Sequence, residues 1–381
     1  MSRFRIPGAL LALSLSLSAC GGDGGTDVGN PLTLTVDGRL ERGSVVTVTA
    51  TASGAVIAPG TVQLSVSPAD GAELLGNGQV RLLRDGRLTF TATAPQRVGS
   101  KEITVAAPPV VVFDKMVSGN RDIWRVDLDG QNLTRLTTDG GDDGDATVAR
   151  QRVVFTSYRA GNAELFSVPL AGGADTRLTT TPGNETTPAL SADGERLAYS
   201  YDVGDVSKVW IANGNGSGAA RATSGFGFSG SVETAPAWAP TGNRMMLVAT
   251  ALGTADLFSL QTPPPSAPAL AAGGDAPEVE PAWSPDGASV VFTSNRASGG
   301  SGPTDLYLLN VSSGAVTRLT QTAVTEIQPA WTPDGRIVYT EATTGGVTRL
   351  RWLDPATPAT SFAIETGTGN AQRPAVSAPL N

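Results

Sequence analysis

The feature that most constrains the fold of this chain is a repeat of about 45 residues that begins at Val110 and continues to the C-terminus. One strand-like segment recurs as VVVFDK, RVVFTS, RLAYSY, RMMLVA, SVVFTS and RIVYTE, starting at residues 110, 152, 196, 244, 289 and 336. Such a period is typical of four-stranded units that bury their apolar faces against neighbouring copies. The repeat therefore predicts an array of similar small antiparallel sheets.

A second segment precedes most of these strands and contains a tight turn. It reads PALSADG from Pro188, PAWAPTG from Pro236, PAWSPDG from Pro281 and PAWTPDG from Pro329, with a degenerate DATVAR from Asp145. Pro fixes φ at the first central position of a turn, and Asp-Gly tolerates the positive φ of a hairpin. Each segment is thus predicted to be a strand that turns directly into the next one.

Two further strands complete the repeat, one typified by DLYLL and one by Arg-Leu-Thr from Arg318. In this order the segments resemble the TolB-type propeller repeat, a WD40-like repeat, over roughly residues 110–381. The resemblance implies an all-β fold, a six-bladed β-propeller, and contacts with other proteins of the cell envelope. The family's α/β N-terminal domain has no counterpart here, so the resemblance does not by itself imply a part in the Tol-Pal system.

The C-terminal segment at Pro374–Ser377 supplies the strand that the first blade lacks, because the array begins at the VVVFDK strand. Pairing the two ends would close the ring and remove the exposed edge that an open sheet presents. Residues 108–381 are therefore predicted to form one closed propeller.

Residues 31–107 alternate apolar and polar side chains in several short stretches, such as VVTVTATA at 45–52 and RLTFTATA at 87–94. Alternation with period two predicts half-buried antiparallel strands, and the turns between them suit a small β-sandwich. In length and strand count this region resembles a bacterial immunoglobulin-like (Ig-like) domain. The resemblance implies a spacer, with an adhesive module as the alternative.

The N-terminus carries an export signal. Arg3 and Arg5 precede an apolar run that is shorter than a membrane-spanning helix requires, so residues 1–19 are predicted to be a cleaved signal peptide. Leu17–Cys20 resembles a bacterial lipobox, which implies lipidation of Cys20, and Gly21 after it implies an outer-membrane lipoprotein facing the periplasm or the cell surface. Residues 20–30 are Gly-rich and predict a flexible tether.

Composition excludes several kinds of chemistry. The chain has no His and a single Cys, so it contains no Ser-His or Cys-His nucleophile pair, no His-ligated metal and no internal disulfide. The formal net charge of −8 disfavours nucleic acid as a partner. The chain is accordingly interpreted as a binding or scaffolding protein without enzymatic activity.

Acidic residues stand three positions before several Pro-Ala pairs, at what would be the start of the innermost strands. If they surround one mouth of the central channel, they concentrate negative potential and could bind a cation or a basic peptide, and oxygen ligands suit Ca²⁺. The alternative is that each acid braces a neighbouring blade through loop amides or through Arg159 or Arg296. The candidates are Glu185, Glu233, Glu278 and Glu326, with Asp142 at the matching place and with Asp143, Asp145 and Glu280 nearby.

Two other hypotheses stay open at this stage. Trp238, Trp283 and Trp331 share one repeat position and either pack between blades or form a stacking platform for a ligand. The propeller could instead be an enzyme that cleaves polysaccharide with paired carboxylates, or a remnant of a peptidase gating domain. No motif in the sequence singles out a catalytic pair.

Overall fold

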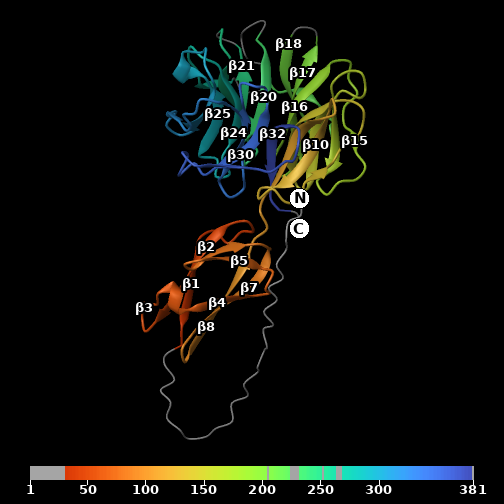
Figure 1. Cartoon of the computed structure of the whole chain (residues 1–381). Coiled ribbons are helices and arrows are strands. Elements are labelled where there is room, and N and C mark those ends of the chain that lie inside the picture. The colour runs from red at the N-terminus through yellow and green to blue at the C-terminus, as the bar shows by residue number, and fades with distance from the viewer. Residues whose placement is uncertain (1–30, 204–205, 224–230, 251–252, 263–267, 380–381) are drawn as a thin grey trace. The chain divides into compact units, whose positions relative to one another are not determined.

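The computed structural model describes residues 31–381 apart from 204–205, 224–230, 251–252, 263–267 and 380–381 (Figure 1). The predicted signal peptide, Cys20 and the tether lie outside these residues. The chain divides into two compact units. The first contains the described residues up to Arg39 together with Val45–Arg81 and Arg87–Thr104, and the second contains Leu40–Ser44, Leu82–Gly86 and the chain from Val105 onward.

Two antiparallel sheets make up the first unit. One has the order β1-β2-β6-β5, with the short strand β3 also pairing with β2, and the other has the order β4-β7-β8. The elements are β1 (Thr33–Asp37), β2 (Val45–Ala52), β3 (Ala55–Val56), the 3-10 turn η1 (Pro59–Thr61), β4 (Gln63–Ser67), β5 (Ala72–Gly76), β6 (Gln79–Leu82), β7 (Gly86–Ala94) and β8 (Arg97–Val105).

The alternation in the sequence explains how these sheets bury one face. Along β2, alternate residues from Val46 to Ala52 are buried, and in β7 the buried residues are Leu88, Phe90 and Ala92. One cavity of about 230 Å³ is lined by residues of both sheets, among them Leu34 and Leu64, so the two inner faces lie opposite each other. The unit is a small β-sandwich, and its likeness to Ig-like domains stays a prediction.

The second unit consists of four-stranded antiparallel sheets, which we call blades I to VI. Blade I has the order β11-β10-β9-β32, and the others follow the chain as β12–β15, β16–β19, β20–β23, β24–β27 and β28–β31. The first strands of blades II to VI, together with β32 of blade I, are the inner strands. The inner strands are β12 (Asp143–Ala149), β16 (Asn184–Leu190), β20 (Glu233–Trp238), β24 (Glu278–Trp283), β28 (Thr325–Trp331) and β32 (Asn370–Ser377).

The remaining strands of each blade follow outward. The second strands are β9 (Val110–Val117), β13 (Arg152–Ser157), β17 (Arg196–Val203), β21 (Arg244–Ala249), β25 (Ser289–Ser294) and β29 (Ile337–Ala342). The third are β10 (Asn120–Asp127), β14 (Glu164–Pro169), β18 (Val206–Asn213), β22 (Asp256–Gln261), β26 (Asp305–Asn310) and β30 (Thr348–Leu353). The outermost are β11 (Thr134–Arg135), β15 (Thr176–Arg177), β19 (Ala220–Arg221), β23 (Ala269–Ala272), β27 (Val316–Arg318) and β31 (Ser361–Ala363), and a second 3-10 turn, η2 (Arg296–Ser298), follows β25.

Contacts between the inner strands close the ring. Each inner strand contacts the next, from β12 through β16, β20, β24 and β28 to β32, and β32 in turn contacts β12. Strand β32 also pairs antiparallel with β9, with Ser377 opposite Val110 and Asn370 opposite Met116. The C-terminal strand therefore completes blade I, and the predicted all-β, six-bladed propeller is confirmed.

Apolar cores lie between blades as well as within them. One cluster joins Val112 and Ile123 of blade I to Val153, Phe155 and Phe166 of blade II. Phe155 and Phe166 stack with their ring centroids 6.2 Å apart. Since each blade covers its neighbour in this way, no blade is a complete hydrophobic core by itself.

The repeated tryptophans belong to this packing. Trp238 and Trp283 are each 8% exposed, and their indole nitrogens donate hydrogen bonds to carbonyl oxygens of the preceding blade, Ala189 at 3.0 Å and Ala237 at 3.1 Å. Trp331 donates in the same way to Ala282 at 3.2 Å. The packing interpretation is therefore confirmed for Trp238 and Trp283, and the half-buried Trp331 makes the same hydrogen bond between blades. No helix among the described residues is long and apolar enough to cross a membrane.

Removing β32 should destabilise the whole propeller, because β9 would become an exposed edge and blade VI would lose the strand that it packs against. We expect a chain truncated after Gly369 to lose its cooperative thermal transition and to aggregate, as measured by circular dichroism and size-exclusion chromatography. A control chain that lacks only Leu380 and Asn381 should melt like the intact protein. An unchanged melting temperature in the longer truncation would contradict closure by this strand.

Candidate functional site

The predicted acids lie at the start of the inner strands, but they do not line an open channel mouth. Each of the four glutamates is at most 1% exposed. Each carboxylate contacts hydroxyl or cationic groups within its own surroundings rather than the carboxylates of a ring. The four residues are Glu185 in β16, Glu233 in β20, Glu278 in β24 and Glu326 in β28.

Glu278 is braced by an arginine of its own blade. Arg296, which follows β25 in η2, donates a hydrogen bond to the carboxylate of Glu278, while its guanidinium lies 5.6 Å from the ring centroid of Phe292. Burial raises the pKa of Glu278, and Arg296 partly offsets the rise. This arrangement is the bracing role that the sequence offered as one of its two alternatives.

In blade II the matching acid is Asp143 and not Asp142, which corrects the sequence alignment. Asp143 pairs with Ser157 in the strand register, as Glu278 pairs with Ser294. Arg159 forms an ion pair with Asp143 at 2.8 Å. Asp142 is exposed and accepts the backbone N–H of Arg121 at 3.0 Å. The shift arose because the DATVAR segment lacks the Pro that marks the position elsewhere.

The other three glutamates have different partners. Lys208 lies 2.9 Å from Glu233, and Arg221 lies 3.7 Å from it. Glu185 accepts hydrogen bonds from the hydroxyls of Thr179, at 3.2 Å, and Thr181. Glu326 accepts one from the hydroxyl of Thr320.

Within the described part of the chain, no group of three or more Asp, Glu, Cys or His side chains could hold a metal ion. The acids are separated because each is buried at a different blade junction, whereas a Ca²⁺ ion needs six to eight oxygen ligands converging on one point. The structure thus does not bring together the ring of carboxylates on which the calcium hypothesis depended.

A different set of residues surrounds the centre of the ring. In every inner strand a β-bulge shifts the pairing register. The residue directly before the repeated Pro, or before Ala146 in blade II, has a positive φ between 47° and 57°. Left-handed backbone is costly for residues other than Gly, and bulges of this kind often re-aim side chains at functional sites. The residues are Asp145, Thr187, Ala235, Glu280, Gln328 and Arg373.

These six residues, with the Pro or Ala that follows each, line one cavity of about 200 Å³. Because all six inner strands contribute to it, the cavity is the opening of the central channel. We call the six left-handed residues the channel ring. It presents carboxylate, amide, hydroxyl and guanidinium groups next to apolar proline rings.

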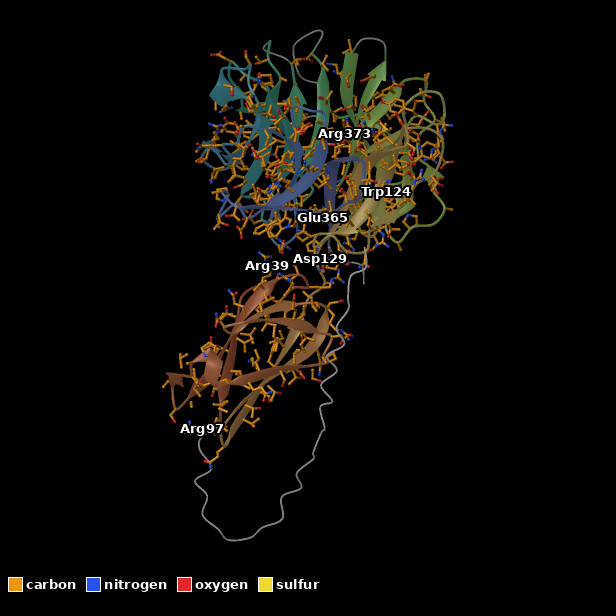
Figure 2. All side chains as sticks on the ribbon, viewed as in Figure 1. Arg39, Arg97, Trp124, Asp129, Glu365 and Arg373 are labelled. Carbon is orange, nitrogen blue, oxygen red and sulfur yellow. The ribbon has the colours of Figure 1, made fainter. Side chains whose placement is uncertain are left out.

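Charges in the channel ring are linked to one another. Arg373 of β32, labelled in Figure 2, forms an ion pair with Asp145 at 2.8 Å and lies 3.4 Å from the buried carboxylate of Asp114. Arg121 also contacts Asp114, at 3.0 Å. Burial raises the pKa of Asp114 to about 6, and the two arginines limit the rise. Two cations and two carboxylates are thus held together beside the channel.

Glu280 continues this network on the other side. Its carboxylate accepts the backbone N–H of Gln328 at 2.7 Å and the hydroxyl of Thr293 at 3.0 Å. The side-chain oxygen of Gln328 in turn accepts the backbone N–H of Arg373 at 3.1 Å. Burial raises the pKa of Glu280. The ring is therefore pre-organised to offer charge-assisted hydrogen bonds to a ligand that enters the channel.

Sequence reasoning placed Asp145 and Glu280 near a channel mouth but did not identify Arg373 or the ring itself. The available signal was positional, because the residue before each Pro-Ala pair recurs at the same place in the repeat. It was hidden by the change of residue type from blade to blade, and the bulge that turns this residue toward the axis is not visible in a binary pattern of apolar and polar residues.

Taken together, the closed ring of blades and its bulged inner strands define a six-bladed β-propeller with a polar channel opening. Residues 187–379 match the family model described as the TolB beta propeller domain, PD40. The chain belongs to this family. No curated protein sequence matches the chain.

Solved structures agree on the fold. TolB from Acinetobacter baumannii superposes with a TM-score of 0.63 at 12% identity, over 77% of this chain and 80% of that one. A putative TolB from Agrobacterium tumefaciens gives 0.52 at 16% identity, over 69% and 87%. A chain of a nidogen/laminin complex gives 0.55 at 10% identity, over 70% and 98%. At these identities the likeness establishes the fold alone.

Breaking the Arg296–Glu278 pair should be costly, since Glu278 is fully buried. We expect Arg296→Ala to lower the free energy of unfolding by about 3 kcal/mol, because it leaves an uncompensated buried carboxylate. Adding Glu278→Gln should recover most of the loss. As a control, Arg81→Ala breaks the exposed pair with Glu73 and should cost no more than about 0.5 kcal/mol. Equal effects of the two arginine changes in urea unfolding would contradict the bracing role.

Proposed function

We propose that this protein is a non-enzymatic lipoprotein of the cell envelope whose propeller binds a protein partner at the channel ring. The observation that carries the proposal is the linked set of charges at the channel opening, where Arg373, Asp145 and Glu280 lie on strained, bulged backbone. Strain of this kind persists where the surrounding structure fixes it, and it often accompanies binding sites. Membership of the TolB beta propeller domain family supports a binding role.

The chemistry of the ring favours binding over catalysis. Glycoside cleavage requires two carboxylates that flank the bond, one of them free to act as an acid. Asp145 is paired with Arg373, and Glu280 accepts two hydrogen bonds. Such groups suit recognition of backbone and charged side chains of a peptide segment, whereas no observation favours a polysaccharide substrate.

Anchoring rests on the sequence of the N-terminus. Leu17–Cys20 resembles a lipobox, and Gly21 favours sorting to the outer membrane. The Gly-rich residues that follow would let the folded units extend from the membrane surface. In this proposal the sandwich unit acts as a spacer and the propeller reaches the partner.

The anchor is tested by changing Cys20 to Ser. Without the thiol no acyl chain can be attached, so we expect the variant to move from the membrane fraction to the soluble fraction of the envelope in cells that produce it. Mass spectrometry of the N-terminal peptide should show two or more acyl chains on the unchanged protein and none on the variant. A variant that stays in the membrane fraction would argue against this anchor.

The binding site is tested by photo-crosslinking in the envelope of the producing cells. A photoreactive residue at Ala235, in the channel ring, should give a discrete adduct with an envelope protein. The same residue at Thr317, on the outermost strand of blade V, serves as the matched control and should not. Arg373→Glu should abolish the adduct, and circular dichroism should show that the variant, in which Arg121 still pairs with Asp114, remains folded. Adducts of equal intensity from both positions, or an adduct that survives the charge reversal, would refute the channel ring as the site.

A further inference from the structure

The junctions between blades repeatedly bring two buried ionisable side chains together. One comes from the start of the third strand of a blade, and the other from the start of the inner strand of the following blade. At the junction of blades II and III these are Glu164 and Glu185, both 0% exposed. The backbone crosses the same junction, because the N–H of Glu185 donates to the carbonyl of Ala163 at 2.9 Å.

The surroundings of this pair neutralise only one of its two carboxyls. Arg177 of the outermost strand contacts one oxygen of Glu164 at 2.7 Å. Glu185 forms no ion pair with a cation of the described residues and is held by the hydroxyls of Thr179 and Thr181. The second oxygen of Glu164, Oε2, is buried without a hydrogen-bond partner among the described atoms. A buried acceptor without a donor is costly, so the pair lacks one proton donor.

The junction of blades V and VI has the same arrangement. Arg318 of the outermost strand contacts Asp305 at 2.8 Å, and the hydroxyl of Thr320 donates to Glu326. Oδ1 of Asp305 is again buried without a partner in the described structure. The N–H of Glu326 donates across the junction to the carbonyl of Thr304 at 2.9 Å.

At the junction of blades III and IV a positive and a negative side chain occupy these two positions. Between blades III and IV the third-strand position carries Lys208, which forms an ion pair with Glu233 at 2.9 Å. Between blades IV and V the same two positions carry Asp256 and Glu278, and Arg296 pairs with Glu278. Among the described residues, no cation pairs with the inner-strand glutamate at the junctions of Glu185 and Glu326, which lie three junctions apart in the order of the blades, on opposite sides of the ring.

We propose that Glu164–Glu185 and Asp305–Glu326 each hold one shared proton, and that its loss loosens these two opposite junctions of the propeller. A proton on Glu185 gives Oε2 of Glu164 the donor that it lacks, and a proton on Glu326 does the same for Asp305. When the proton leaves, two negative charges face each other in a buried place with a single arginine beside them. Repulsion then favours separation of the blades at the backbone bond that crosses the junction.

The direction of the pH effect follows from the groups around Glu185. Burial raises its pKa from 4.5 to about 7, and the negative charge of Glu164 adds to the rise while the threonine hydroxyls oppose it. The other ionisable groups that face it are Arg177, which is paired with Glu164, and Tyr199, whose own pKa Glu185 helps to raise. The folded junction binds a proton that the separated one releases. Its stabilisation is full below pH 4.5 and is lost as the pH rises to about 7.

Glu326 shows the same direction. Burial raises its pKa, the hydroxyls of Thr320 and Thr322 oppose the rise, and the carboxylates of Asp305 and Glu341 add to it. The nearby Arg351 pairs with Glu341, at 3.4 Å. Tyr339 faces the same carboxyl, and its own pKa is also raised.

Hydrogen exchange of the full-length protein tests the proposal at each junction separately. After correction for the intrinsic pH dependence of exchange, opening measured at the amide of Glu185 should rise by up to about tenfold per pH unit between roughly pH 5 and 7. Opening at the amide of Glu326 should also increase as the pH rises. The amide of Leu170, which donates to the carbonyl of Gln151 at 2.8 Å at the opposite end of blade II, is the internal control and should show no such rise.

Neutral glutamine mimics the protonated acid, so Glu185→Gln should keep its junction protected at all pH values while the Glu326 junction still responds. Glu164→Gln should have the same effect as Glu185→Gln, which provides a second variant if the first folds poorly. Glu233→Gln is the matched control at the Lys208 junction and should leave the pH response at the other two junctions unchanged. Protection at Glu185 that is independent of pH in the unchanged protein, or a pH response that survives both glutamine variants, would overturn the proposal.

Discussion

The structure depends on the pairing of β32 with β9, the two strands that lie at opposite ends of the repeat array. A propeller blade leaves one edge to its neighbour, and a chain of blades that does not close leaves an inner surface and an open edge exposed to water. Pairing Ser377 with Val110 removes that exposure and aligns the six inner strands around one axis. The channel exists because of this closure, and the left-handed residues converge on it only when the ring is complete.

Burial of charge is the second constraint, and the protein meets it differently at each blade junction. The repeat supplies an ionisable residue at the start of the inner strand of blades II to VI, and Ala371 takes that place in blade I. Arg159 and Arg296 compensate two of them from within the blade, and Lys208 compensates Glu233 from the preceding blade. Hydroxyl groups hold the remaining two. A symmetrical fold therefore has unequal junctions, and the differences arise from single side chains at equivalent positions.

The channel ring combines strain and charge in one place. Each inner strand contains a bulge, so two of its residues oppose one on the next strand, and the left-handed residue points its side chain differently from a regular strand. In four of the six strands that residue is Asp, Glu, Gln or Arg. In five of the six strands a Pro follows this residue and limits how the chain can relax. The backbone therefore fixes the geometry of the proposed binding site.

The sequence alone determined the class of fold and the number of blades, because both follow from the period of the repeat and from the short turns within it. It also located the buried acids to the start of the inner strands, since an acid at a fixed distance from Pro-Ala recurs four times. The exception was blade II, where the Pro is missing and the assignment fell on Asp142 instead of Asp143. In a strand, a shift of one residue exchanges the buried face for the exposed one, so no local pattern could decide between them.

Only the tertiary structure decided what these acids contact. Alternation predicts that a side chain is on one face of a strand, but not whether that face meets the channel, an arginine or another carboxylate, because the partner belongs to a loop or a blade distant in sequence. Arg296 is 18 residues from Glu278, and Arg373 is 259 residues from Asp114. The contact of Arg373 with Asp114 depends on closure of the ring, whereas Arg296 reaches Glu278 within blade V. The tertiary structure thus places the predicted acids in separate buried pairs and a different set of residues around the channel.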